Sequence, residues 1–143
     1  MIVFDVDRVG PWVCDRTGGA YYPGAGAAIG LEKNGELIAG VFYDNYNGRS
    51  ICMHVAAVGK NWLNREYLFV CFDYPFRQLK VNKILGFVDS TNHDALKFDK
   101  HLGFEIETVI KDAGPHGDLI ILSMTNENCR WLNGRKKQST PGS

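Results

Sequence analysis

The clearest pattern along the chain is an alternation of apolar and polar positions between residues 27 and 58. Three β-rich runs lie there, Ala27 to Glu32, Glu36 to Asp44 and Ser50 to Val58. The first two are separated by Asn34-Gly35, a dipeptide that strongly favours a two-residue hairpin turn. The pattern therefore predicts a three-stranded antiparallel meander.

A helical period replaces this alternation after the meander. From Asn61 to about Leu79, apolar side chains recur at helical spacing, and Pro75 is expected to kink or end the helix. Lys83 to Asp89 is predicted to be a strand again. The intervening helix is long enough for a right-handed parallel crossover, and a ligand is expected to bind there.

Capping and turn residues mark the next elements. Asn92 is predicted to cap a helix that runs through His101 and stops at Gly103. Glu105 to Lys111 and Leu119 to Met124 are expected to pair as a closing hairpin. Together with the meander, these elements predict an α+β fold with a mixed, mainly antiparallel sheet and helices packed on it.

The two ends of the chain carry weaker signals. Met1 to Asp5 is predicted to be a short strand, and glycines and prolines predict a long loop from there to residue 26. Residues 134–143 contain no apolar side chain and are predicted to be a disordered tail. A single domain over 1–133 follows, since 143 residues suit one hydrophobic core.

The charge balance, the apolar runs and the cysteine spacing of the chain disfavour several classes of partner and of cellular location. Sixteen Lys and Arg balance sixteen Asp and Glu, so nucleic acid and anionic membranes are disfavoured. No apolar run approaches the roughly 20 residues that a membrane helix needs, and no leader is visible, which predicts neither a membrane span nor secretion. The four cysteines are widely spaced without a zinc signature, so no metal is expected and a reducing, cytoplasmic compartment is predicted.

Two segments carry candidate chemistry. The first is a strand, Val58-Gly59 and the start of a helix, where unpaired amides and the helix dipole suit a phosphate group. The second is the helix that begins at Asn92, with Ala95, Phe98 and Gly103-Phe104 at intervals of three to five residues. This segment resembles the N-x-x-A-x-x-x-Y-x-x-x-G-F stretch of the GNAT acyltransferases, the acetyl-CoA-dependent N-acetyltransferases.

The order of the predicted elements also resembles that superfamily between about Ala27 and Met124. The Tyr74-Pro75-Phe76 step, the ending Cys129-Arg130-Trp131-Leu132 and the short length are similar to compact stand-alone members found in phage genomes. A phage-encoded chain would act in the host cytoplasm. The resemblance implies a sheet whose central strands splay apart, an acetyl-CoA donor and no metal.

The resemblance also implies a set of cofactor-binding residues. The end of the third meander strand would pair with the pantetheine arm as an added strand would. The following turn would hold the pyrophosphate, and the Asn92 helix would line the thiol end. The implied residues are Val55, Ala56, Ala57, Val58, Gly59, Lys60, Asn61, Trp62, Leu63, Asn64, Arg65, Asn92, Ala95 and Phe98.

The sequence departs from the family pattern in one loop and at one helix position. The R-x-x-G-x-G/A loop of the family is replaced by residues 59–64, which keep one glycine and contain Trp62. The position of the usual tyrosine general acid holds Asp99. Asp99 is expected to lie ionised on a polar helix face, and it is therefore predicted not to be the acid.

Acyl transfer to an amine also needs a base. His54 is the candidate, because it is on the strand beside the expected thioester and histidine titrates near neutral pH. The alternative is a core histidine held by a backbone partner. His93 and His101 are expected to be solvated, and Cys52 offers a less favoured acyl-enzyme route.

The resulting function is direct transfer of acetyl from acetyl-CoA to a primary amine. The acceptor would be a small molecule or a peptide, and a homodimer is allowed for. The alternative is a non-catalytic GNAT-fold module that binds CoA or a protein partner.

Overall fold

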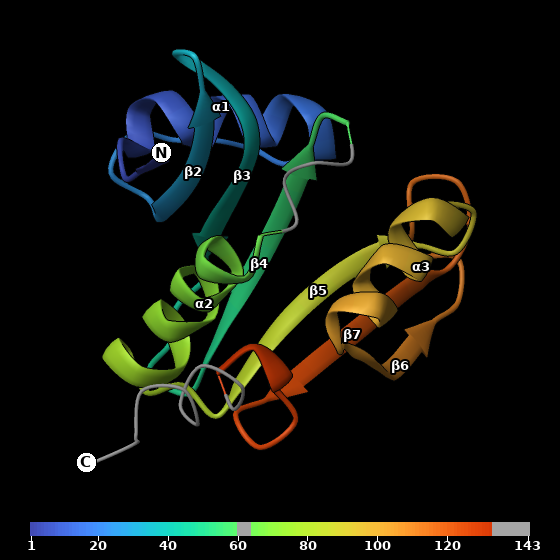
Figure 1. Cartoon of the computed structure of the whole chain (residues 1–143). Helices are drawn as coiled ribbons and strands as arrows, with labels where there is room; N and C mark the ends of the chain where they lie inside the picture. The colour runs from blue at the N-terminus through green and yellow to red at the C-terminus, as the bar shows by residue number, and fades with distance from the viewer. Residues whose placement is uncertain (60–63, 133–143) are drawn as a thin grey trace.

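The computed structural model describes residues 1–59 and 64–132. Its described strands form one sheet in the order β1-β2-β3-β4-β5-β7-β6 (Figure 1). The elements are β1 (Ile2–Val3), α1 (Val6–Thr17), β2 (Ala27–Lys33), β3 (Glu36–Asp44), β4 (Ser50–Ala57), α2 (Arg65–Asp73), a π-helical turn (Tyr74–Gln78), β5 (Lys83–Asp89), α3 (His93–Leu102), β6 (Glu105–Ile110) and β7 (Leu119–Thr125). The predicted α+β class and mainly antiparallel sheet are confirmed.

The predicted meander is confirmed as β2, β3 and β4. Asn34 and Gly35 both have positive φ, 54° and 82°, as the tight turn between β2 and β3 requires. The register places Gly30 opposite Gly40. The absent side chains let α1 pack closely on the sheet, because a Cβ on Gly40 would stand 2.6 Å from Val13.

The prediction of a long loop in the first 26 residues is wrong. α1 spans Val6–Thr17 although it contains Gly10 and Pro11, and the opening strand is only Ile2–Val3. Val9 and Val13, four residues apart, are fully buried against the sheet. Burial of this face overrides the local helix-breaking tendency of glycine and proline.

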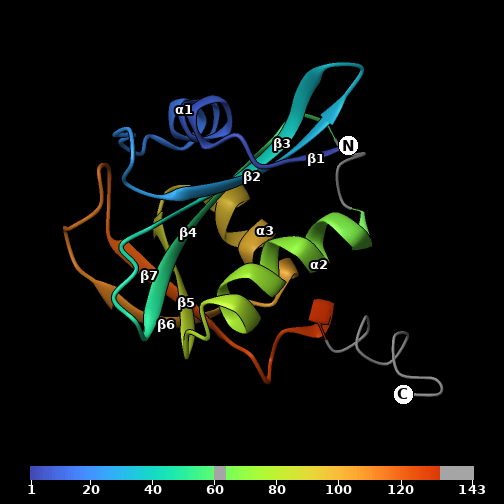
Figure 2. The same cartoon turned by 90° about the vertical axis from the view of Figure 1, so that its left-hand side faces the viewer.

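The opposite face of the sheet is covered by α2 and α3, whereas α1 lies alone on its own side (Figure 2). The main core lies between these two helices and the sheet and includes Tyr67, Phe72, Ile84 and Leu122. The buried Tyr67 hydroxyl donates to the carbonyl of Ile29 on β2, 2.8 Å away. α2 is thereby tied to the meander.

The predicted caps of α3, Asn92 and Gly103, are confirmed, whereas the Asn64 cap of α2 was not predicted. The Asn64 side chain accepts from the Tyr67 N–H at 2.6 Å, and that of Asn92 accepts from the Ala95 N–H at 3.2 Å. Gly103 ends α3 with φ 118°. The helix predicted from Asn61 begins at Arg65 in the described residues, and the Pro75 step continues as the π-helical turn.

Candidate active site

The central feature of the site is the separation of β4 from β5. The two strands are parallel and pair at three positions, Ser50 with Lys83, Ile51 with Ile84 and Cys52 with Leu85. Beyond these pairs the strands diverge (Figure 1). Main-chain groups along both facing edges are therefore left without a neighbouring strand, and an extended, amide-containing ligand arm has the chemistry to pair with them.

The predicted pantetheine residues occupy one edge of this opening. Val55 is partly buried and Ala56 is buried. Ala57, Val58 and Gly59 are exposed. The Val58 N–H is engaged by the carbonyl of Ile38 on β3. Gly59 has φ 74°, a conformation that favours glycine.

The predicted pyrophosphate residues are described only in part. Lys60, Asn61, Trp62 and Leu63 lie outside the described residues. Asn64 caps α2, and the exposed Arg65 is its first residue. A helix N-terminus carries a partial positive charge, so this end of α2 and the Arg65 guanidinium favour an anion.

His54 lies at the start of the opening. It is two residues beyond Cys52, the last residue of β4 paired with β5. Its Nε2 is 2.9 Å from Oδ1 of Asp44, and about a quarter of each side chain is exposed, 23% and 25%. The alternative of a histidine held by a backbone partner is wrong in that respect, because its partner is a carboxylate.

The acyl-enzyme alternative at Cys52 gains no support from the geometry. Burial raises the pKa of the Cys52 thiol, so the nucleophilic thiolate is disfavoured. The sulfur accepts from the Asn45 amide at 3.8 Å, whereas His54 bonds to Asp44. A reactive cysteine requires an adjacent base or a lowered pKa.

Asp99 does not lie on a solvated face of α3, and that expectation is wrong. Its Oδ2 is 3.7 Å from the position that a Cβ on Gly86 would take, so the carboxyl faces β5 where the strand leaves β4. Burial raises the pKa of Asp99 to about 6. A carboxyl with this pKa is partly protonated in weak acid, which removes the premise for excluding Asp99 as an acid.

The remaining predicted residues lie on α3. Asn92 follows the end of β5 and caps the helix through the Ala95 N–H. Ala95 and Phe98 are partly buried against the main core. The predicted solvation of His93 and His101 is confirmed, since both are exposed.

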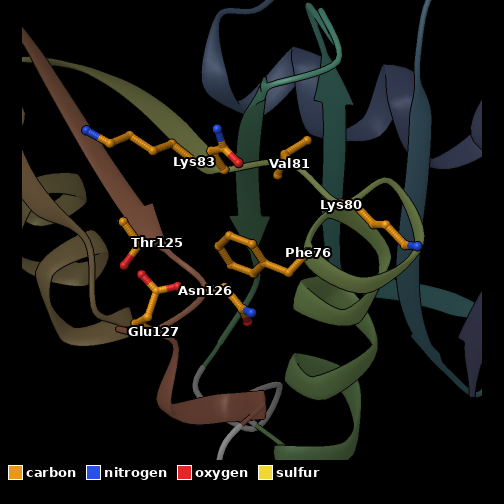
Figure 3. A pocket seen from close by; sticks show the side chains of 8 residues that line it. Phe76, Lys80, Val81, Lys83, Thr125, Asn126 and Glu127 are labelled. Carbon is orange, nitrogen blue, oxygen red and sulfur yellow. The ribbon is translucent and has the colours of Figure 1, made fainter.

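Two surface cavities lie near the end of the sheet where β4 and β5 are still paired. One, of about 420 Å³, is lined by Phe76 and by residues at the start of β5 and the end of β7. Figure 3 shows Lys80 and Lys83 pointing away from each other around it. The other, of about 270 Å³, includes Asp44 and Tyr46. Neither lies in the opening beyond the paired residues.

No group of three His, Cys, Asp or Glu side chains is arranged to hold a metal ion within 1–59 and 64–132. In the same part of the chain, no helix has both the length and the apolar character needed to cross a membrane.

No protein-family model and no curated protein sequence matches the chain. Solved structures do match its fold. A mutant form of the spermidine N-acetyltransferase SpeG from Vibrio cholerae has a TM-score of 0.70 and 16% identity, covering 94% of this chain and 99% of that chain. The N-acetyltransferase PseH from Campylobacter jejuni, in complex with acetyl coenzyme A, has a TM-score of 0.56 and 19% identity, covering 72% and 70%. The chain therefore has the GNAT N-acetyltransferase fold, as the sequence motif predicted.

Proposed function

We propose that this chain is an N-acetyltransferase that moves an acetyl group from acetyl-CoA directly to a primary amine. The observation that carries the proposal is the early end of β4–β5 pairing, with His54 two residues beyond it. The fold similarity to SpeG, described as a spermidine N-acetyltransferase, and to PseH, described as an N-acetyltransferase, supports the same reaction class. One of them is described with acetyl coenzyme A bound.

The donor-binding residues are proposed along one continuous path. Val55 to Val58 would pair with the pantetheine arm, and Gly59 to Arg65 would hold the pyrophosphate. Asn92, Ala95 and Phe98 would line the thiol end. The unpaired edge of β4 and the N-terminus of α2 are the groups that fit an amide-containing arm and an anion. The donor supplies the acetyl thioester.

His54 is proposed as the base for the acceptor amine. An ammonium group is not nucleophilic, so the amine must lose a proton before or during attack on a carbonyl. The imidazole lies on the α1 side of the sheet, on the opposite side from Asp99 and α3. We therefore assign the α1 side of the opening to the acceptor, a small amine or a peptide amino group.

We also propose a cellular setting for the enzyme. The four described cysteines are all free and buried, which is consistent with a reducing cytoplasm. We propose that one domain spans residues 1–133 and that the chain is a compact member of the phage type, acting in the host cytoplasm. A homodimer is compatible with the exposed apolar side chains of β6, Ile106, Val109 and Ile110.

The direct test is release of the CoA thiol from acetyl-CoA in the presence of a panel of amines. The panel contains simple primary amines, polyamines and peptides with free amino termini. We expect amine-dependent thiol release and an acetylated product of matching mass. The control variant is His101→Ala, which changes an exposed histidine on α3. The activity of this variant should equal that of the unmodified chain. CoA binding without transfer to any amine would instead favour the non-catalytic module.

A further inference from the structure

Asp44 and His54 are neighbours on one face of the β3–β4 hairpin. The register pairs Phe42 with His54 and Asp44 with Cys52, so Asp44 is a diagonal neighbour of His54 on the same face. The Nε2 to Oδ1 distance is 2.9 Å, within hydrogen-bond range. Both side chains remain about a quarter exposed, at 23% and 25%, so the pair is accessible to a ligand on this face.

The direction of this hydrogen bond defines the histidine tautomer. An ionised carboxylate only accepts hydrogen bonds, so Nε2 of His54 must carry the proton and donate it to Asp44. A neutral imidazole has one protonated nitrogen, so its lone pair is then on Nδ1. We infer that Asp44 is a positioning residue that holds His54 as the Nε2–H tautomer and presents Nδ1 to the acceptor amine. This inference rests on the proposed function.

The ring plane of His54 is constrained separately. The Phe42 ring stacks on the imidazole, with centroids 6.1 Å apart and planes 27° from parallel. Tyr21 packs edge-on against Phe42 at 5.7 Å, and its hydroxyl donates to Asp7. The ring contact and the hydrogen bond to Asp44 therefore both restrict the orientation of the imidazole.

Other titratable groups near the pair lie on α1 and β4. Burial, with a contribution from the Asp44 charge, raises the pKa of the Cys14 thiol on α1 and of the Cys52 thiol on β4. Asp15 adds to the shift at Cys14. Both thiols therefore stay neutral near pH 7, and Asp44 is the carboxylate in direct contact with the imidazole.

The assignment gives a balanced transfer step. The amine nitrogen attacks the thioester carbonyl carbon, and a C–N bond forms while the amine proton moves to Nδ1 of His54. Asp44 stays ionised and stabilises the imidazolium through Nε2–H. The C–S bond then breaks, the sulfur leaves with the electron pair, and the proton held by His54 is returned through solvent to the thiolate. Amide and thiol are the products.

The test combines a tautomer measurement with kinetics on Asp44→Asn. Nitrogen-15 NMR of the imidazole in the unmodified full-length chain should show a protonated Nε2 and an unprotonated Nδ1. In Asp44→Asn this preference should be lost, because an amide also donates hydrogen bonds. We expect kcat to fall by about a hundredfold or more, with the KM for acetyl-CoA within about twofold, as for loss of tautomer control in a catalytic triad.

Glu36→Gln is the matched control, since Glu36 is an exposed carboxylate on the same strand, and its kcat should not change. An Nδ1–H tautomer in the unmodified chain would overturn the inference even if the variant failed to fold. A kcat for Asp44→Asn within about threefold of the unmodified chain would overturn it as well, because the loss of transition-state stabilisation would then be under about 0.7 kcal/mol. Absence of any transfer by the unmodified chain would instead refute the proposed function.

Discussion

The carboxyl of Asp99 on α3 lies against Gly86 on β5, with Oδ2 3.7 Å from the position of a Cβ at that glycine. Burial raises the pKa of Asp99 to about 6, above the value of roughly 3.9 for a solvated Asp. The folded chain therefore favours the protonated carboxyl. Its contribution to stability is complete below about pH 4 and is lost as pH rises through about 6.

Asp99→Asn should remove this pH dependence. Because the amide cannot ionise, the variant should gain on the order of 2 kcal/mol in unfolding free energy at pH 7 relative to the unmodified chain, and little at pH 4. Urea unfolding at four pH values between 4 and 7 measures the effect. Glu105→Gln, an exposed carboxylate on β6, is the control. Parallel stability curves for Asp99→Asn and the unmodified chain would contradict the assignment.

Gly40→Ala should destabilise the chain by overpacking. The added Cβ would meet Val13 at 2.6 Å and Val9 at 3.1 Å, and both are fully buried in α1. We expect a loss of about 1 to 3 kcal/mol in unfolding free energy. Gly86→Ala is the matched control, because its new Cβ would make only an ordinary contact at 3.7 Å. Equal stability of the two variants would show that α1 does not pack tightly on β3.

The Asp89 carboxylate should connect the turn after β5 to the loop between β6 and β7. Its carboxylate accepts from the N–H and hydroxyl of Thr91 and from the N–H groups of His116 and Gly117, at 2.6 to 3.1 Å. These bonds keep the pKa of Asp89 well below its usual value. Its stabilising effect is therefore present above the unfolded pKa of roughly 4 and is lost as pH falls towards the folded value.

Asp89→Asn should speed amide hydrogen exchange at His116 and Gly117, since a neutral amide oxygen is a weaker acceptor than a carboxylate. Nuclear magnetic resonance at neutral pH measures both rates. Asp112→Asn changes an exposed carboxylate in the same loop and should leave them unaltered. Unchanged exchange in Asp89→Asn would rule out this connection between β5 and the β6–β7 loop.

His54→Ala should flatten the rising limb of the pH–rate profile. In the unmodified chain, kcat/KM should rise with pH through one ionisation, because the base must be neutral to accept a proton. The affinity for acetyl-CoA should change little, since the side chain faces the α1 side of the sheet, which is proposed for the acceptor. Initial rates across the pH range, with direct CoA titration, measure both quantities. An unchanged limb in the variant would assign His54 to structure alone.

The elements predicted correctly have strong local signals. Asn34-Gly35 needs positive φ at both residues, and Asn92 and Gly103 mark the two ends of α3, so neighbouring residues define these features. α1 was missed because Gly10 and Pro11 oppose a helix locally. The spacing of Val9 and Val13, with the left-handed Gly18 after the helix, is the signal that could have revealed it.

The site was less predictable, because its contacts join distant parts of the sequence. The bond between Asp44 and His54 depends on the register of the hairpin, which a one-residue shift would abolish. The burial of Asp99 involves packing of its carboxyl against Gly86, a residue of another element. Neither the Asp44–His54 bond nor the burial of Asp99 can be predicted from residue type and local spacing. His54 itself could be proposed from the strand pattern together with the resemblance to the GNAT acyltransferases.

The central claim is that acetyl-CoA binds in the opening between β4 and β5. The most direct measurement is residue-resolved amide hydrogen exchange with and without saturating acetyl-CoA. The account predicts slower exchange at Val55 and Ala57, whose N–H groups face the edge of β4 that β5 leaves unpaired, with little change at Ala56 and Val58, whose N–H groups face β3, and in β6. Unchanged exchange along β4, or protection confined to another part of the molecule, would contradict it.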